Sequence, residues 1–473
     1  MLQQLIIAFL LIVVSFVMSV FAQDAPQLPA TTAGQRVAGY LKAFNSGNET
    51  QMREFFTNNV APVALEQRPV EARLEVFQEM RGEFGNLELK RVSSSDESQV
   101  TILARAQKSG WLEIGFEFEA KPPHKMLSLR VEDAQPPTGD APKAAMPAPT
   151  TEAELLAALK NHLAELVKAD EFSGAVLLAK AGKPLFHQAY GLASKEFNAP
   201  NRPDTKFNLG SINKTFTQMA IGQLVAQGKL AYDDTLGKHL PDYPNREAAE
   251  KVTIRQLLSM SSGIGDFFGP KFEATSKDKL RTINDFLPLF ASAPLAYAPG
   301  ARQQYSNGGY IVLGAIIEKV TGQDYYAYVR EKIFKPAGMN DTDWYEADAP
   351  TPNLASGYTR EGGGNTRRNN IYTRPAKGSP AGGGYSTAPD LLKFALALHS
   401  GKLRAYDFRN LNPSGATGTF GGLGIAGGAP GINAVLEIGP ADGYTLIVMS
   451  NYDPPSAEKV ARQVRGWLKH IKQ

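Results

Sequence analysis

The feature that most constrains this chain is a stretch rich in proline and alanine, residues 134–149, which reads AQPPTGDAPKAAMPAP. It has no apolar periodicity that could bury one face of a helix or strand, and its prolines stiffen the backbone. The sequence on either side has its own separate pattern of apolar residues. We therefore expect two domains, residues 32–133 and 150–473, joined by a linker over residues 134–149.

The first domain has the pattern of helices followed by strands. Apolar residues recur at helical spacing up to about residue 80, and alternation with polar residues follows. The clearest strand alternates the apolar residues Leu112, Ile114, Phe116 and Phe118. One apolar face per strand is what an antiparallel sheet packed on helices requires. The order resembles the cone-shaped nuclear-transport-factor-2-like fold, which implies a small α+β domain.

Residues 1–22 read MLQQLIIAFLLIVVSFVMSVFA and end in small residues at the spacing of a signal-peptidase site. This predicts a cleaved signal peptide and a periplasmic or secreted protein. The first Lys or Arg is Arg36, and the apolar run is nearly as long as a membrane span. A retained N-terminal membrane anchor is the alternative, and contact with a membrane is expected only in that case.

The composition excludes several classes of function. Fifty Lys and Arg against 47 Asp and Glu leave a formal net charge of +3, and no run of like charge is long enough to bind a nucleic acid. The absence of cysteine excludes disulfides, thiol nucleophiles and zinc–thiolate sites. The six histidines lack the HExxH or HxH spacing that holds a metal ion. We expect neither a metal site nor a cofactor.

The second domain begins and ends with similar elements. Thr151 and Glu154 have capping-box spacing ahead of an apolar helical face. A hairpin pattern follows at residues 174–191, another occupies residues 434–450, and a final helix begins after Ser456. Helix, strand, strand at one end and strand, strand, helix at the other predict an antiparallel sheet built from both chain ends, flanked by helices. The domain is therefore α+β, with a helical subdomain between its two halves.

No GxSxG occurs, so an α/β-hydrolase nucleophile is unsupported. The phrase FNLGSINKTF instead places Ser211 and Lys214 three residues apart, where a helix brings both side chains to one face. Ser211 also lies at the expected helix start, which favours negative charge. Two other pairs have the same spacing, Ser276 with Lys279 and Ser456 with Lys459. We interpret Ser276 as a solvated residue in a charged run and Ser456 as a helix N-cap.

A second polar group follows in PGARQQYSNGGYIVLGAII, where Tyr305, Ser306 and Asn307 precede an apolar helix. One interpretation makes Ser306 or Asn307 the N-cap of that helix. The other places the Tyr305 phenol beside the Lys214 amine. Tyr243 and Asn245 also fit a YxN spacing, but the flanking sequence PDYPNRE predicts an exposed turn.

Residues 150–473 resemble the serine β-lactamase and penicillin-binding-protein-like superfamily, closest to its class C β-lactamase and family VIII esterase branch. The resemblance rests on phrases in the same order, including GSINK, TIRQLLSMSSGIGD, the YSN helix start, SPAGGGYSTAPDLLKFALAL and GGAPGINAVLEI. It implies that Ser211 is the acylated nucleophile, with Lys214 and Tyr305 as proton-transfer partners and Asn307 as polar support. It also implies an oxyanion hole made by the backbone N–H groups of Ser211 and Gly428.

Lys and Tyr side chains have unperturbed pKa values near 10, so a base at neutral pH needs a shift. We expect burial to lower the pKa of Lys214 and the neighbouring ammonium to lower that of Tyr305. From the sequence, the shared proton belongs to the coupled pair rather than to either residue.

One position departs from the family pattern. The branch places Lys, His or Trp on the strand that lines the site, and here Ile425 stands there, ahead of Gly427. With Ile425 and Gly427 in the substrate pocket, a buried substrate carboxylate has no cation to meet. We therefore expect a carboxylesterase acting on a small ester or amide. The alternatives are a β-lactamase or D-amino-acid peptidase of DD-carboxypeptidase type, and a non-catalytic penicillin-binding-like module. The sequence does not fix the oligomeric state.

Overall fold

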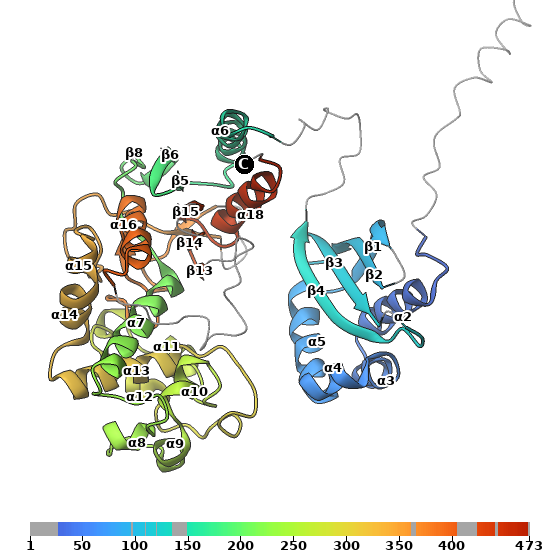
Figure 1. The fold of residues 1–473 in the computed structure, drawn as a ribbon, viewed down its shortest axis with the longest axis horizontal. Coiled ribbons are helices and arrows are strands. Elements are labelled where there is room, and N and C mark those ends of the chain that lie inside the picture. The colour runs from blue at the N-terminus through green and yellow to red at the C-terminus, as the bar shows by residue number, and fades with distance from the viewer. Residues whose placement is uncertain are drawn as a thin grey trace, which may run out of the picture. The chain divides into compact units, whose positions relative to one another are not determined.

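The computed structural model describes residues 27–95, 98–108, 110–119, 121–134, 149–360, 366–403, 423–439 and 443–471. The chain divides into two compact units, residues 1–146 and 147–473, which Figure 1 draws. The expected signal peptide at residues 1–22 and nearly all of the linker at 134–149 lie outside the described residues. Within the described ranges, no helix is long and apolar enough to cross a membrane.

Over its described residues, the first unit has four helices followed by a four-stranded sheet. The strands pair antiparallel in chain order, β1-β2-β3-β4, and the helices lie on one side of the sheet (Figure 1). Alternate residues of β3, including Leu112, Ile114 and Phe116, are buried in the shared apolar core. The elements are α2 (Thr32–Ser46), α3 (Glu49–Asn59), α4 (Pro62–Gln67), α5 (Val70–Phe84), β1 (Leu87–Ser95), β2 (Gln99–Ala106), β3 (Gly110–Phe118) and β4 (Met126–Ala134). The similarity to the nuclear-transport-factor-2-like fold stays a prediction.

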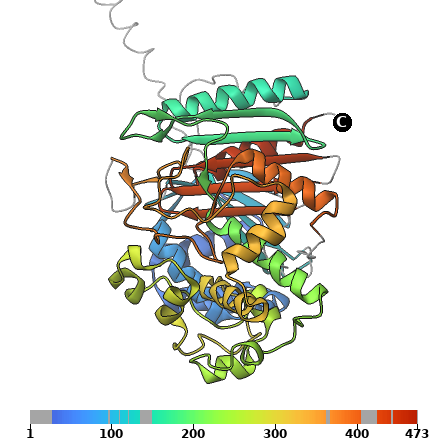
Figure 2. The same ribbon diagram turned by 90° about the vertical axis from the view of Figure 1, so that its left-hand side faces the viewer.

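The second unit has a five-stranded antiparallel sheet in the order β13-β14-β15-β5-β6. Figure 2 shows its strands from the two ends of the unit, green and red, lying side by side above the yellow-green helices. The α+β class with a sheet built from both chain ends is therefore confirmed. The strands are β5 (Gly174–Lys180), β6 (Lys183–Tyr190), β13 (Leu423–Ala429), β14 (Ile432–Ile438) and β15 (Tyr444–Ser450).

The two faces of this sheet pack against different helices. On one face, α6 (Glu152–Lys168) and α18 (Ser456–Leu468) bury leucine and valine side chains against β5, β14 and β15. Thr151 and Glu154 form the expected capping box at the start of α6. On the other face lie α7 (Asn213–Ala226) and α16 (Ala388–His399), which belong to the large apolar cluster continuous with the helical subdomain. Helix α7 is buried on nearly every side, so its first turn is held rigidly.

The helical subdomain and the connecting segments complete the unit. Its helices are α8 (Leu236–His239), α9 (Arg246–Lys251), α10 (Ile254–Leu258), α11 (Pro270–Ala274), η3 (Lys277–Lys279), α12 (Ile283–Phe290), α13 (Asn307–Thr321), α14 (Tyr325–Val329), η4 (Arg330–Phe334) and α15 (Lys335–Ala337). Short strands pair in the connections, namely β7 (Leu192–Ser194), β8 (Ala199–Pro200), β9 (Phe207–Asn208), β10 (Tyr358–Thr359), β11 (Arg368–Asn369) and β12 (Tyr385–Ser386).

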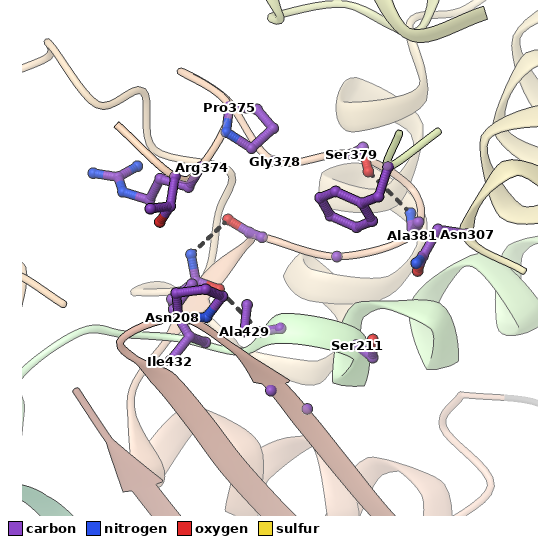
Figure 3. Close-up of a pocket in the computed structure, with 18 of the residues that line it drawn as sticks. Asn208, Ser211, Asn307, Arg374, Pro375, Gly378, Ser379, Ala381, Ala429 and Ile432 are labelled. Carbon is purple, nitrogen blue, oxygen red and sulfur yellow. Dashed lines mark hydrogen bonds between the residues drawn. The ribbon is translucent and has the colours of Figure 1, made fainter. Parts of the chain in front are cut away.

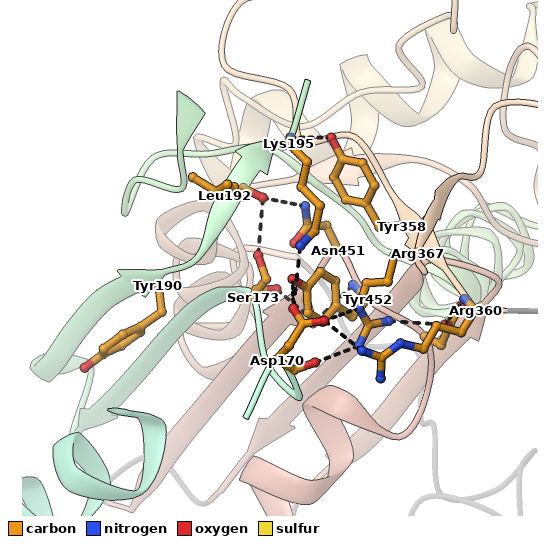
Figure 4. Close-up of polar contacts among 12 residues, drawn as sticks. Asp170, Ser173, Tyr190, Leu192, Lys195, Tyr358, Arg360, Arg367, Asn451 and Tyr452 are labelled. Atoms are coloured by element: carbon orange, nitrogen blue, oxygen red, sulfur yellow. Dashed lines mark hydrogen bonds and ion pairs between the residues drawn. The ribbon is translucent and has the colours of Figure 1, made fainter. Parts of the chain in front are cut away.

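A charged cluster fixes the connection around β10 and β11 to the end of the sheet (Figure 4). The Asp170 carboxylate forms ion pairs with Arg360 at 2.8 Å and Arg367 at 3.3 Å, and accepts a hydrogen bond from the Tyr452 hydroxyl at 2.6 Å. The Arg367 guanidinium also stacks over the Tyr452 ring, 3.6 Å from its centroid. The Arg367 side chain is only 8% exposed, so its stacking on Tyr452 is shielded from solvent, whereas Arg360 and Asp170 are 42% and 44% exposed.

Three local expectations from the sequence can be compared with this fold. Ser276 is exposed, as expected. The N-cap role of Ser456 is wrong, because Pro455 precedes the helix and the Ser456 hydroxyl bonds to Ser450 at 2.8 Å inside the core. The exposed turn at Tyr243 is also wrong, because its ring is 5% exposed and packs into the large apolar cluster. Although polar residues flank Tyr243, its ring anchors the turn by packing into the core.

Candidate active site

Ser211 lies on a tight turn that leads from β9 into α7. The 3-10 turn η2 (Gly210–Ile212) precedes the helix directly. Gly210 has a φ of 49°, and a Cβ atom there would lie 2.9 Å from the Gly428 nitrogen. The Asn208 side chain accepts a hydrogen bond from Gly210 N at 2.9 Å, which holds the turn. Only glycine suits position 210, and this turn places Ser211 beside strand β13.

The Lys214 ammonium group lies one turn further along, in contact with Ser211. Its Nζ atom is 3.1 Å from Ser211 Oγ, 2.6 Å from Tyr305 Oη, 2.7 Å from Asn307 Oδ1 and 2.6 Å from the Ala381 carbonyl oxygen. The residue is 5% exposed. Burial lowers the pKa of Lys214 to about 7, although the negative charge of Asp266 raises it. Lys214 can therefore be a neutral amine at neutral pH, which is the state that accepts a proton.

Tyr305 completes a hydrogen-bonded group of three side chains. Its hydroxyl lies 2.5 Å from Ser211 Oγ and 2.6 Å from Lys214 Nζ. Although 54% of the residue is exposed, its hydroxyl is enclosed by Ser211 and Lys214, and burial raises the pKa of Tyr305. The expectation of a lowered pKa is wrong, because the burial of Tyr305 outweighs the opposing effect of its hydrogen bond with Ser211. Tyr305 therefore keeps its proton, and Lys214 is the base of the pair.

Asn307 is held in place by a carboxylate that the sequence reasoning missed. Asp266 Oδ2 accepts hydrogen bonds from the backbone N of Asn307 at 3.1 Å and from its Nδ2 at 2.7 Å. This fixes the amide so that its oxygen faces Lys214. Ser306 is the N-cap of α13 and accepts from Gly309 N at 2.9 Å. Asp266 ends the phrase SSGIGD, but nothing in its local spacing points to Asn307.

Strand β13 passes close against the Ser211 turn. A Cβ atom added to Gly427 would lie 2.7 Å from Ser211 N and 2.1 Å from the Leu209 carbonyl oxygen. The Gly427 carbonyl is bonded by Asn433 Nδ2 at 3.1 Å. The structure thus brings Gly427, Gly428 and Ser211 together, which is the arrangement that two backbone N–H donors facing one oxygen require.

A cavity of about 800 Å³ opens over these groups (Figure 3). Its lining includes Ser211, Tyr305, Asn307, Gly427 and Gly428, together with the aromatic side chains of Phe267, Phe268, Phe272 and Tyr372. Within the described part of the chain, no group of His, Asp and Glu side chains is arranged to hold a metal ion.

The placement of Ile425 in the substrate pocket is wrong. Ile425 pairs with Leu436 across β13 and β14 and packs against the large apolar cluster on the same face of the strand as Gly427, and it is absent from the residues that line the cavity. A cation does line the cavity, however, and the sequence reasoning missed it: Arg374, on the connection that follows β11. Residues 404–420, which include the further cations Arg404 and Arg409, lie outside the described residues.

A serine bonded to a buried lysine and a tyrosine, beneath a cavity and beside a glycine-rich strand, defines a serine hydrolase site of SxxK type. The family model of Beta-lactamase matches residues 159–468. The chain therefore belongs to the Beta-lactamase family, and it is a serine hydrolase of the β-lactamase and penicillin-binding-protein superfamily. The resemblance seen in the sequence is confirmed for this unit.

Individual relatives have different activities in their names. Penicillin-binding protein 4* of Bacillus subtilis (strain 168) is 35% identical over 177 residues, 37% of this chain and 38% of that protein. Esterase EstB of Burkholderia gladioli is 35% identical over 209 residues, 41% of this chain and 53% of that protein. The chain thus spans about two fifths of the length of penicillin-binding protein 4* and about half of the length of esterase EstB. The crystal structure of a penicillin binding protein from Bacillus halodurans is 30% identical with a TM-score of 0.58, covering 65% of this chain and 98% of that one.

Proposed function

We propose that this protein is an exported carboxylesterase that forms an acyl-enzyme on Ser211. The observation that carries the proposal is the contact of Ser211 Oγ with both Lys214 Nζ and Tyr305 Oη, at 3.1 Å and 2.5 Å. A buried Lys with a pKa of about 7 is a base matched to neutral pH. No cofactor takes part in this chemistry.

Acylation starts with transfer of the Ser211 hydroxyl proton to Lys214, directly or through Tyr305. The serine oxygen attacks the ester carbonyl, and the N–H groups of Ser211 and Gly428 stabilise the oxyanion. Each donor contributes about 3 to 4 kcal/mol to stabilisation of the transition state. The proton then passes through Tyr305 to the departing alcohol. Water, activated by the same pair, attacks the acyl-enzyme and releases the carboxylic acid.

Three observations support an ester as substrate. Esterase EstB is 35% identical over 209 residues. Ile425, where the family pattern has Lys, His or Trp, offers no charge at that end of β13. Aromatic side chains line the cavity and suit the apolar part of a small acyl group. The oligomeric state does not enter the mechanism.

A second candidate is reaction with a β-lactam or a D-amino-acid peptide. It is favoured by the similarity to penicillin-binding protein 4* and to the Bacillus halodurans structure. The third is a penicillin-binding-like module without turnover, which would keep the fold and lose the chemistry.

Labelling with a fluorophosphonate tests the proposal, read by intact-mass spectrometry and peptide mapping. We expect one adduct, on Ser211, and none on the Ser211→Ala variant. The Ser276→Ala variant, which removes the exposed serine of another SxxK pair, should label as the wild type does. Steady-state rates on p-nitrophenyl butyrate, nitrocefin and a D-alanyl-D-alanine peptide then rank the candidates. Labelling elsewhere than Ser211 contradicts the proposal, and faster nitrocefin hydrolysis favours the second candidate.

We also propose that residues 32–133 and 150–473 are separately folding domains and that residues 1–22 are a cleaved export signal. Separate apolar cores in the two units support the first statement. A truncated chain starting at Thr150 should be soluble and keep butyrate turnover within about tenfold, or 1.4 kcal/mol in the barrier. N-terminal sequencing of the secreted protein tests the second statement, and an intact Met1 would favour the membrane anchor.

A further inference from the structure

The cavity above Ser211 contains a positive charge that the proposed chemistry does not use. Arg374 is the one basic residue among the cavity-lining residues that the structure describes, which also include the carboxylates of Glu273 and Glu458. Its guanidinium lies 5.9 Å from the centroid of the Tyr385 ring and forms no hydrogen bond or ion pair with any described residue. A partly buried guanidinium without a partner is a donor available to a ligand.

The backbone on both sides of Arg374 is fixed. Asn370 donates from its backbone N to the Gly357 carbonyl at 3.0 Å and from Nδ2 to the Pro430 carbonyl at 2.8 Å. The Thr373 hydroxyl donates to the Asn370 carbonyl at 2.9 Å. Ala376 N donates to the Lys277 carbonyl at 2.9 Å. Arg374 therefore extends from an anchored segment whose upstream end is held by the charged cluster at Asp170.

Asn370, four residues before Arg374, bonds to the carbonyl of Pro430, which directly follows the last residue of β13, Ala429. This contact places the Arg374 segment beside the C-terminal end of β13. The family position of the usual cation, Ile425, comes before Gly428 on this strand, whereas Pro430 comes after it. Relative to the proposed oxyanion donor, Arg374 and Ile425 thus lie in opposite directions. The anion that Arg374 could meet is not the one that a residue at position 425 would meet.

Figure 3 shows which part of a bound substrate would face Arg374. Arg374 and Asn307 lie at opposite ends of the cavity, with Ser211 nearer to Asn307. The departing alcohol must lie at the Asn307 end, because Tyr305 and Lys214 return its proton there. An acyl group that extends the other way passes the side where Figure 3 places Ala429, Ile432 and Arg374.

We propose that the site takes esters whose acyl group ends in a carboxylate, such as half-esters of dicarboxylic acids, and that Arg374 binds that carboxylate. The inference rests on the proposed esterase function and deepens it. The planar guanidinium can hold a carboxylate by two parallel hydrogen bonds. Phe267, Phe268 and Tyr372, which line the same cavity, offer apolar surface to the methylene chain between the two carbonyl carbons.

The test compares matched esters on the full-length protein. Values of kcat/KM are measured for p-nitrophenyl butyrate and for the mono-p-nitrophenyl esters of adipic and suberic acid, with the rate of Ser211→Ala subtracted. One charge-assisted hydrogen bond corresponds to about 10- to 100-fold. We expect Arg374→Gln to lower the ratio of the better half-ester to butyrate by that factor, and Arg374→Lys to restore part of it.

Two controls make the outcome specific. Arg368→Gln removes an exposed cation from the same segment, outside the cavity lining, and should leave both rates unchanged. The ester 4-butyryloxybenzoate carries its carboxylate on the departing alcohol. The ratio of its kcat/KM to that of p-nitrophenyl butyrate should not change in Arg374→Gln. An unchanged half-ester ratio in Arg374→Gln, or a response confined to 4-butyryloxybenzoate, overturns the proposal. A failure of the proposed esterase function can be told apart from a failure of this inference. In that case the wild type would neither hydrolyse p-nitrophenyl butyrate nor be labelled on Ser211.

Discussion

The two ends of the cavity are built from different kinds of structure. At one end, Ser211 and Lys214 lie on the first turns of a helix that is buried on nearly all sides, and every contact of Lys214 Nζ is made within the protein. At the other end, Arg374 lies on a segment between short strands, near Tyr372, which is 87% exposed. The core fixes the reacting groups, and the loops leave a charge free for recognition.

This difference predicts how variants should behave. Changes at the Ser211 end should lower the rates of neutral and anionic esters by the same factor, because both share the reacting carbonyl. Changes at the Arg374 end should alter the ratio between them. Each prediction below is therefore measured on both p-nitrophenyl butyrate and a mono-p-nitrophenyl half-ester.

The largest effect is expected from Lys214→Met. Removing the base leaves the Ser211 hydroxyl with only Tyr305, which burial holds in its protonated form by raising its pKa, so that it cannot accept the serine proton. We expect kcat/KM to fall by about 10³- to 10⁴-fold for both esters. Thermal unfolding should not show a matching loss, because Met replaces a buried amine in a site that is 5% exposed. Retention of more than a tenth of the activity would show that the proton does not pass through Lys214.

The next largest effect is expected from Gly427→Ala. Its Cβ would lie 2.7 Å from Ser211 N, so the strand or the turn must move apart at the proposed oxyanion hole. We expect a fall in kcat of about 10²- to 10³-fold for both esters, the size seen when one oxyanion donor is lost. Gly466→Ala on α18 is the matched control, because a Cβ there meets nothing within 4 Å. An unequal loss on the two esters would contradict the separation of the two ends.

The same contrast explains what the sequence could predict. Ser211 and Lys214 are three residues apart at one helix start, and Tyr305 and Asn307 lie at another, so local spacing together with the flanking sequence predicts both pairs. The sheet built from both chain ends followed from the order of hairpins and helices. These are short-range patterns. It was the family resemblance that implied that the Ser211–Lys214 pair and the Tyr305–Asn307 pair belong to one site.

What the sequence did not reveal depends on contacts between distant segments. Arg374 reaches the cavity because Asn370 bonds to Pro430, 60 residues further along the chain. Asp266 supports Asn307 across 41 residues. Ile425 lies on the same face of β13 as Gly427, but its side chain packs against the large apolar cluster, a contact between distant segments that a family position does not reveal. Whether a side chain on a strand lines a cavity depends on what packs against it, which the sequence alone leaves open.

A smaller effect is expected from pH. A base must be unprotonated to act, and burial lowers the pKa of Lys214 to about 7. We expect kcat/KM of the wild type to rise with pH and level off above about 7, falling roughly tenfold per pH unit on the acid side. The plot of kcat/KM against pH for p-nitrophenyl butyrate should show this fall on the acid side. The half-esters should show the same fall at the same pH, because their carboxylates are ionised throughout that range. A profile flat down to pH 5 would exclude Lys214 as the base.

The smallest effect is expected from Asp266→Asn, because Asp266 acts through Asn307 rather than on the substrate. Its negative charge raises the pKa of Lys214, against the stronger effect of burial. Removing that charge should move the acid limb of the pH profile to lower pH, with a loss of less than about tenfold at pH 8 for both esters. Asp242→Asn, an exposed carboxylate of the same domain, should leave the limb in place. A purely structural role for Asp266 would lower the rate without moving the limb, because only the charge couples it to the titration of Lys214. A shift of the limb to higher pH would mean that the loss of orientation at Asn307, whose Oδ1 lies 2.7 Å from Lys214 Nζ, outweighs the loss of charge.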